Sequence, residues 1–523
     1  MALLPILKIH LPMIALPVIT KDGRSLKMDL QMSAWPRFFL AALLASTLAL
    51  GMFGIGRSLW LDEAWVANSI HAPTLREMFV YPEWLQTSPP LFLLFSRGVV
   101  SLMGLSNTAF RVVPLGLALI ASGGMFSLSR RVLSLPWAVL ASALVVFHPA
   151  FIEYSHSAKQ YSGEVACTTL VLLAVVRYLE NPSRREYLFL IAALVVALFA
   201  AYPVVFLLPG VLAAVYFTSA RRAAGLAMAT GGTLFTIWVV FIRPNTAAEL
   251  RAFWAADADA LFTPGLIAAS LLVLSLMLRV LVTRKTFVGT SQWTQLICAA
   301  PCLLLAIASI GGWYPATQRM RLWVLPCFVL LCLMNAEDLL GRKFPRSWGA
   351  VALGFALFFA AVNVRNQIRE RRDLPEEDFS GAFQYLKGHV GPTDLLLVHA
   401  AAREGFRLYS AMDGWGGPPP IYGSTGWPCC ARGKNALPGR STEASVVTDI
   451  DTMIPPGFSG KVWLFYSTRP SHWSYVGMNE GNLWRKHVWA RGCPPGTYIP
   501  LKNLAISPMD CGQGSTLAST TIR

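Results

Sequence analysis

The stretch FRVVPLGLALIASGGMFSLSRR, residues 110–131, decides the fold class of this chain. It joins an apolar run of about twenty residues, long enough to cross a bilayer, to a pair of arginines at its end. Similar runs recur on both sides of it. We therefore predict a polytopic α-helical membrane protein with about eleven transmembrane helices, at 38–56, 110–129, 135–152, 164–179, 187–202, 203–218, 224–242, 265–283, 293–311, 322–340 and 348–364.

The composition excludes several other classes of protein. Of the 523 residues, 54% are hydrophobic and only 14% are charged, whereas soluble domains carry roughly 25% charged residues. A disordered chain would be poor in apolar residues. The net charge of +16 could suggest a nucleic-acid partner, but residues 1–364 hold 27 basic and 15 acidic side chains. Since most of the excess lies in the apolar part, we expect no nucleic-acid partner.

The basic clusters orient the helices. Lysine and arginine are retained in cytoplasmic loops, and with eleven spans every tight basic cluster falls on one side of the membrane. These clusters are Arg130-Arg131, Arg184-Arg185, Arg221-Arg222, Arg284-Lys285 and Arg342-Lys343 with Arg346. Residues 1–37 are then a cytoplasmic segment, 38–364 the membrane domain, 57–109 its first external loop, and 365–523 an external domain.

One apolar segment, PPLFLLFSRGVVSLMG at 89–104, is left out of this count. It is short and contains Arg97. If it crossed the membrane, every later basic cluster would change side. We expect it to be a helix that lies along, or dips into, the outer face.

The tail beyond residue 364 is predicted to be an α/β domain. Residues 376–389 have helical apolar spacing, while 394–400 and 462–467 resemble buried strands with a helix between them. Its four cysteines are an even number in an oxidising compartment, which favours one or two disulfides over a zinc site. Their pairing stays open; they are Cys429, Cys430, Cys493 and Cys511.

Chemistry is expected at the outer face, where charges beside apolar spans are costly to place without a role. The first external loop opens with GRSLWLDEAWVANSI, which contains Asp62 and Glu63 between two tryptophans. Paired carboxylates suit a general base or a metal ligand beside a structural partner. An interfacial aromatic anchor with solvated acids explains them equally well.

Several cations and two tyrosines share that side. Such a set suits a phosphate, because arginine binds it with a bidentate fork and lysine as a point charge. Snorkelling to lipid headgroups explains any single one of them, but the convergence of the set favours a phosphate site. Its members are Arg57, Arg111, Lys159, Tyr161, Tyr314, Arg319 and Arg321.

Together these residues resemble a known family. The opening R57-S-L-W-L-D-E-A64 is similar to that of the C-type (GT-C) glycosyltransferases that use polyprenyl-phosphate sugars, in the group of protein mannosyltransferases and aminoarabinose (lipid A) transferases. Further segments of the chain resemble motifs of that family in the same order. They are TSPPLFLLF at 87–95, FRVVP at 110–114, YSHSAKQYS at 154–162 and WYPATQRMRLWVLP at 313–326.

The resemblance implies a sugar transfer at the outer face of a bacterial cytoplasmic (inner) membrane. The donor would be an undecaprenyl-phosphate monosaccharide, and the acceptor a hydroxyl of lipid A, polysaccharide or protein. Asp62 would be the base, with Glu63 next in line, and inversion at the sugar would result. The departing phosphate would be stabilised by Lys159, Arg319 and Arg321, with Arg57 and Arg111 behind them.

Two points stay open at this stage. No cofactor is implied with certainty. A divalent metal stays an alternative, although no His/Asp cluster has ligand spacing. A lipid-linked sugar transporter or flippase, or a non-catalytic envelope assembly factor, would also have many spans. A transporter more often shows internal repeats, and an assembly factor gives no reason for carboxylates that face several cations.

Overall fold

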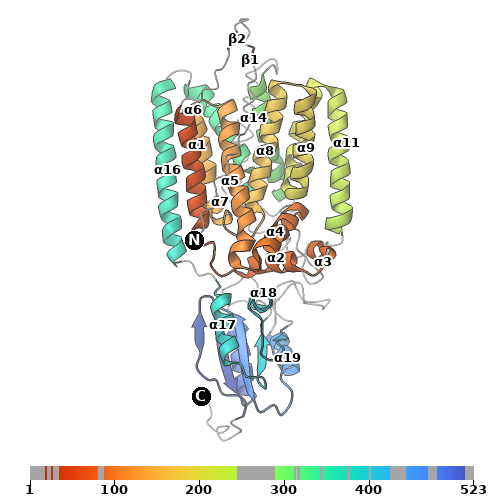
Figure 1. Ribbon diagram of the computed structural model, residues 1–523, viewed down its shortest axis with the longest axis vertical. Coiled ribbons are helices and arrows are strands. Elements are labelled where there is room, and N and C mark those ends of the chain that lie inside the picture. The colour runs from red at the N-terminus through yellow and green to blue at the C-terminus, as the bar shows by residue number, and fades with distance from the viewer. Residues whose placement is uncertain are drawn as a thin grey trace, which may run out of the picture.

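A helical bundle and a smaller α/β domain, joined end to end, make up the chain (Figure 1). The structure is a computed structural model. It describes residues 18–19, 25–26, 34–80, 88–243, 289–310, 314, 319–341, 345–373, 377–399, 402–423, 443–468 and 480–512. The expected span at 265–283, and Cys429 and Cys430, lie outside the described residues.

The bundle confirms the polytopic helical class. Seven helical segments of the described chain are long and apolar enough to cross a membrane. They belong to α1 (Ala34–Met52), α5 (Asn107–Val132), α8 (Tyr161–Glu180), α11 with η2 (Ala220–Ile237, Trp238–Ile242), α14 (Thr290–Ile310), η5 with α15 and η6 (Leu322–Val324, Leu325–Ala336, Glu337–Gly341) and α16 (Pro345–Asp373).

Three further expected spans form shorter or interrupted helices. The expected span 135–152 divides at Pro149 into α6 and α7, because the proline ring starts a new helix more easily than it continues one. The span 203–218 likewise opens with a 3₁₀ turn. The elements are α6 (Leu135–Val146), α7 (Pro149–Tyr154), α9 (Arg184–Ala200), η1 (Tyr202–Leu207) and α10 (Leu208–Thr218).

The first loop contributes three short helices at the end of the bundle nearest the α/β domain (Figure 1). They are α2 (Leu61–His71), α3 (Leu75–Phe79) and α4 (Pro90–Met103). Helix α4 has 14 residues. It is therefore about 21 Å long, which is too short for a hydrocarbon core of about 30 Å. That the segment does not cross the membrane stays a prediction.

Polar contacts tie the helices together at the opposite end of the bundle (Figure 1). Arg131, at the end of α5, pairs with Glu180 at 2.5 Å, and Arg177 pairs with Glu186 at 2.9 Å. Arg222, near the start of α11, donates to the carbonyl of Pro182. The basic loops among the described residues therefore gather at one end. Their assignment to the cytoplasm remains a prediction.

The α/β domain is a five-stranded mixed sheet with helices on both faces. The strand order is β4-β3-β5-β7-β6, parallel on the β4-β3-β5 side and antiparallel on the other. The expected strands at 394–400 and 462–467 are confirmed as β3 and β5. The strands are β3 (Leu395–Val398), β4 (Ile421–Tyr422), β5 (Lys461–Ser467), β6 (Ile499–Leu501) and β7 (Leu504–Asp510).

Two apolar layers hold the helices of this domain on the sheet. Helices α17 (Phe379–His389) and α18 (Arg403–Asp413) cover one face through buried aromatic side chains, among them Phe383 and Phe406. Helices α19 (Glu443–Met453) and α20 (Glu480–Ala490) cover the other, where Trp484 is fully buried. The helix expected at 376–389 and the one between the two strands are thus α17 and α18.

A disulfide joins Cys493 to Cys511, 18 residues apart in sequence. It connects the segment before β6 to the end of β7, and Cys493 is buried in the layer under α20. The prediction of at least one disulfide among the four C-terminal cysteines is therefore confirmed for this pair.

We predict that Cys493→Ala lowers the free energy of unfolding by about 3 kcal/mol, because a short closed loop is no longer constrained in the unfolded chain. Thermal unfolding of the full-length protein, with and without a thiol reductant, measures the effect. Cys332→Ala, which removes a free thiol in α15, should keep the wild-type sensitivity to reductant. An unchanged melting temperature in Cys493→Ala would contradict the prediction.

Candidate functional site

The first loop places its two carboxylates on the first turn of α2, and they point to different partners. Glu63 is fully buried, whereas the side chain of Asp62 retains 18% of its exposure. Adjacent residues on a helix point about 100° apart. The two acids therefore have different surroundings.

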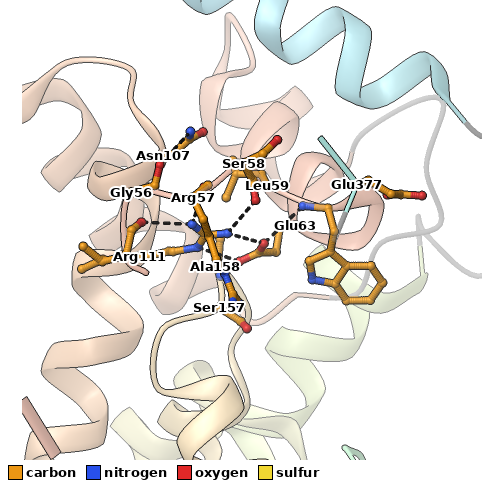
Figure 2. Close-up of polar contacts among 12 residues, drawn as sticks. Gly56, Arg57, Ser58, Leu59, Glu63, Asn107, Arg111, Ser157, Ala158 and Glu377 are labelled. Carbon is orange, nitrogen blue, oxygen red and sulfur yellow. Dashed lines mark hydrogen bonds and ion pairs between the residues drawn. The ribbon is translucent and has the colours of Figure 1, made fainter. Parts of the chain in front are cut away.

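Glu63 lies in a buried network that closes the first loop onto the bundle (Figure 2). Arg111 donates Nε to its Oε1 at 3.0 Å and Nη2 to its Oε2 at 2.6 Å, and neither side chain has any exposed surface. The backbone N–H of Ala158 donates to Oε1 at 2.6 Å, and that of Trp60 donates to Oε2 at 3.3 Å. Both oxygens are thus fully engaged.

Arg111 uses all of its donors within this network (Figure 2). Besides Glu63, it donates to the carbonyls of Ile55 at 3.0 Å, Arg57 at 2.6 Å and Ser58 at 3.2 Å. A guanidinium has five N–H groups, and these five contacts occupy them. Both side chains therefore hold the first loop, and the expected roles of Arg111 as a phosphate ligand and of Glu63 as a reserve base stay predictions.

Asp62 faces a different partner, Arg319, which lies far from it in the sequence of the membrane domain. Arg319 donates Nη1 to its Oδ2 at 2.5 Å, across 257 residues of sequence. The two side chains are 18% and 30% exposed respectively, so a substrate can reach them. The two side chains carry opposite charges in a partly desolvated site, where their attraction is stronger than in water.

Lys159 lies in the turn between α7 and α8, next to the residue whose N–H binds Glu63. It is buried to 7% exposure and interacts electrostatically with Asp62, Arg319 and Glu63. Burial lowers the pKa of the Lys159 ammonium to about 8, against the opposing attraction of Asp62. The site therefore holds one carboxylate and two cations at its centre.

Two tyrosines expected at the site also lie near it. Tyr161, at the start of α8, packs edge-on against Tyr154 with ring centroids 4.7 Å apart, and both rings lie within electrostatic range of Asp62 and Arg319. Tyr314 donates its hydroxyl to the carbonyl of Met320 at 3.0 Å. That hydrogen bond fixes the turn that carries Arg319.

Arg57 and Arg321 lie at the edge of this arrangement. The carbonyl of Arg57 accepts from Arg111, and that of Arg321 accepts from the N–H of Val324 at 3.2 Å, so both backbones belong to turns that frame the site. Both side chains are partly exposed. Their expected role as phosphate ligands stays a prediction.

The α/β domain supplies residues that the sequence did not single out. Glu377 accepts from the N–H of Leu61 at 2.7 Å, and the Tyr409 hydroxyl accepts from the N–H of Leu59 at 2.9 Å. No motif in the sequence connects these positions to the first loop. The sequence placed Glu377 in the segment 376–389 with helical apolar spacing, and Tyr409 in the helix expected between the two strands.

No group of three or more His, Cys, Asp and Glu side chains in the described part of the chain is arranged to hold a metal ion. Asp62 and Glu63 are directed to separate arginines. A divalent metal stays the alternative that the sequence left open.

We predict that Glu63→Ala lowers the free energy of unfolding by about 3–5 kcal/mol, because it leaves the Arg111 guanidinium buried without its partner. The melting temperature of the purified protein in detergent measures this loss. Arg131→Ala, which removes an ion pair that is about one-third exposed, should cost less than about 1 kcal/mol. Equal losses in both variants would contradict the structural role of Glu63.

Comparison with known proteins adds a family match and a shared fold. Residues 87–246 match the family model of the dolichyl-phosphate-mannose-protein mannosyltransferases. The crystal structure of ArnT from Cupriavidus metallidurans in the apo state has a TM-score of 0.51 and 13% identity, covering 91% of this chain and 98% of that one. The structure of that protein bound to undecaprenyl phosphate gives 0.50 and 12%, with the same coverage. None of the curated sequences compared with the chain matches it.

The two findings concern different aspects of the chain. The family match covers the segment from the proline motif at 89–90 through α11, and includes Arg111 and Lys159. The structural likeness extends over both the bundle and the α/β domain, and it establishes the shared fold. The chain is thus similar to this mannosyltransferase family over residues 87–246, and over most of its length it shares the fold of ArnT.

Proposed function

We propose that this protein transfers a monosaccharide from a polyprenyl-phosphate donor, of the undecaprenyl-phosphate type, to a hydroxyl group of a cell-envelope acceptor. The acceptor class comprises lipid A, an envelope polysaccharide or a protein. The observation that carries the proposal is the Asp62–Arg319 ion pair with Lys159 beside it, at the end of the bundle next to the α/β domain. The relative that binds undecaprenyl phosphate shares the fold and supports the choice of donor.

The cations suit the phosphate of such a donor. Lys159 and Arg319 come from different elements, and both lie beside Asp62. Bond cleavage leaves additional negative charge on the lipid phosphate. Fixed cations therefore stabilise the transition state more than the ground state, which is the condition for a faster reaction.

In the proposed reaction, the acceptor hydroxyl attacks the anomeric carbon while Asp62 takes its proton. The new bond forms between the acceptor oxygen and that carbon, and the bond from the carbon to the phosphate oxygen breaks. Attack from the face opposite the phosphate inverts the anomeric centre. The polyprenyl phosphate leaves with the bonding electrons, held by Lys159 and Arg319.

Because Arg319 pairs with Asp62, binding of the donor phosphate is expected to activate Asp62 as a base. While Arg319 donates to Asp62 at 2.5 Å, its charge stabilises the carboxylate and weakens it as a proton acceptor. A phosphate that shares the guanidinium draws part of that interaction away. The donor then both fills the site and makes Asp62 a stronger base.

The proposed setting is the outer face of a bacterial cytoplasmic membrane. The described basic loops lie at the end of the bundle far from Asp62, and Asp62 lies at the end nearest the α/β domain. If those basic loops are cytoplasmic, the site and the α/β domain face the periplasm. That side also provides the oxidising conditions suited to the Cys493–Cys511 disulfide.

We predict that Asp62→Asn lowers kcat for sugar transfer by about 10²–10⁴-fold, the usual contribution of a general base, with donor binding retained. Transfer from a panel of undecaprenyl-phosphate sugars by the purified full-length protein measures it. Glu77→Gln, which neutralises a carboxylate of α3 in the same loop, should leave kcat near the wild-type value. Full activity of Asp62→Asn would contradict the assignment of the base.

We also predict that kcat/KM for the donor falls as the pH rises through about 8. Lys159 is charged below its pKa of about 8 and neutral above it, so it attracts the phosphate only on the acidic side. In Lys159→Arg the guanidinium stays charged, and the alkaline limb should move to higher pH. A limb at the same pH in both proteins would exclude Lys159 as its origin.

A further inference from the structure

Helix α2, which carries Asp62, is packed between the bundle and the α/β domain. On the side of the α/β domain, helix α18 is its neighbour (Figure 1). Leu408 of α18 is fully buried in the same apolar cluster as Leu59, Ala64 and Ala67. The α/β domain therefore completes the core around α2.

Glu377 links the sheet of the α/β domain to the first turn of α2. Its Oε2 accepts from the backbone N–H of Leu61 at 2.7 Å, and its Oε1 accepts from Ser467 Oγ, at the end of β5, at 3.2 Å. The residue is 1% exposed and lies beside the loop that precedes α2 (Figure 2). A carboxylate at this position satisfies a free N–H of the helix end and is favoured by the helix dipole.

Two more contacts fix the rest of the loop and helix. Tyr409 of α18 accepts from the N–H of Leu59 at 2.9 Å and donates its hydroxyl to Asn107 Oδ1 at 2.8 Å, at the start of α5. In the second half of α2, Asn68 Nδ2 donates to the buried carboxylate of Glu404 at 2.9 Å. Contacts from the α/β domain thus occur at both halves of α2.

These contacts lie next to the reacting groups without belonging to them. Leu61 precedes Asp62 in the chain, so a shift of its backbone displaces the carboxylate. The partner of Asp62, Arg319, is carried by the membrane domain. The distance between the base and the cation therefore depends on where the α/β domain holds the start of α2.

We propose that the α/β domain is a positioning element of the active site and that Glu377 is its positioning residue, which sets the place of Asp62 through the N–H of Leu61. The inference rests on the proposed function for its kinetic consequence. A misplacement of about 1 Å can cost a hundredfold in rate. The contact itself exists independently of any substrate, and it can be tested separately.

The kinetic test compares Glu377→Ala, Glu377→Gln and the control Asp451→Asn in the full-length protein. Asp451 is a carboxylate of the same domain that pairs with Arg491 at 3.1 Å within that domain. We expect kcat to fall about tenfold or more in Glu377→Ala with the donor KM unchanged. Glu377→Gln keeps an oxygen acceptor and should restore most of kcat, and the control should match the wild type. Wild-type kcat in Glu377→Ala, or equal losses in Ala and Gln, would overturn the proposal.

The second readout is hydrogen exchange of the peptide that covers residues 57–71, measured by mass spectrometry without substrate. Glu377→Ala should exchange faster there, and Glu377→Gln and Asp451→Asn should match the wild type. Unchanged exchange in Glu377→Ala overturns the positioning role. If the wild type transfers no sugar but the exchange pattern is as expected, the proposed function fails and the positioning of α2 stands.

Discussion

The buried ion pair between Glu63 and Arg111 is the constraint on which the rest of the site depends. It joins α2 to α5. The two carboxylate oxygens of Glu63 also accept from the backbone N–H groups of Trp60 and Ala158. Through Ala158 it holds the turn that carries Lys159. Because a buried charge without its partner is expensive, the loop keeps one conformation. Asp62 is then presented on the other side of the same helical turn.

This division of labour explains why two adjacent carboxylates have such different surroundings. Glu63 has no exposed surface and no free oxygen, so it acts on structure. Asp62 is partly exposed and touches a cation from a distant segment. A single pair of neighbouring residues thus supplies both the anchor of the site and its proposed base. The α/β domain adds a third carboxylate, Glu377, at the start of the same helix.

The sequence predicted the helical membrane class and the core elements of the α/β domain. It also singled out Asp62, Lys159 and Arg319, which the structure brings together. Hydropathy and helical periodicity are local properties, and those predictions needed nothing more. The partners of the carboxylates were beyond it: Arg111 lies 48 residues from Glu63, and Arg319 lies 257 residues from Asp62. Packing decides which cation is available to a phosphate and which one donates all its N–H groups to other protein groups. Arg111, expected as a phosphate ligand, has its N–H groups occupied by Glu63 and three backbone carbonyls.

The most direct test of the central claim is a structure of the full-length protein with undecaprenyl phosphate bound. We predict that the phosphate lies within hydrogen-bond distance of both Lys159 and Arg319. We also predict that the contact between Arg319 and Asp62 is then longer than 2.5 Å. A phosphate bound elsewhere, with the Asp62–Arg319 pair intact, would contradict it.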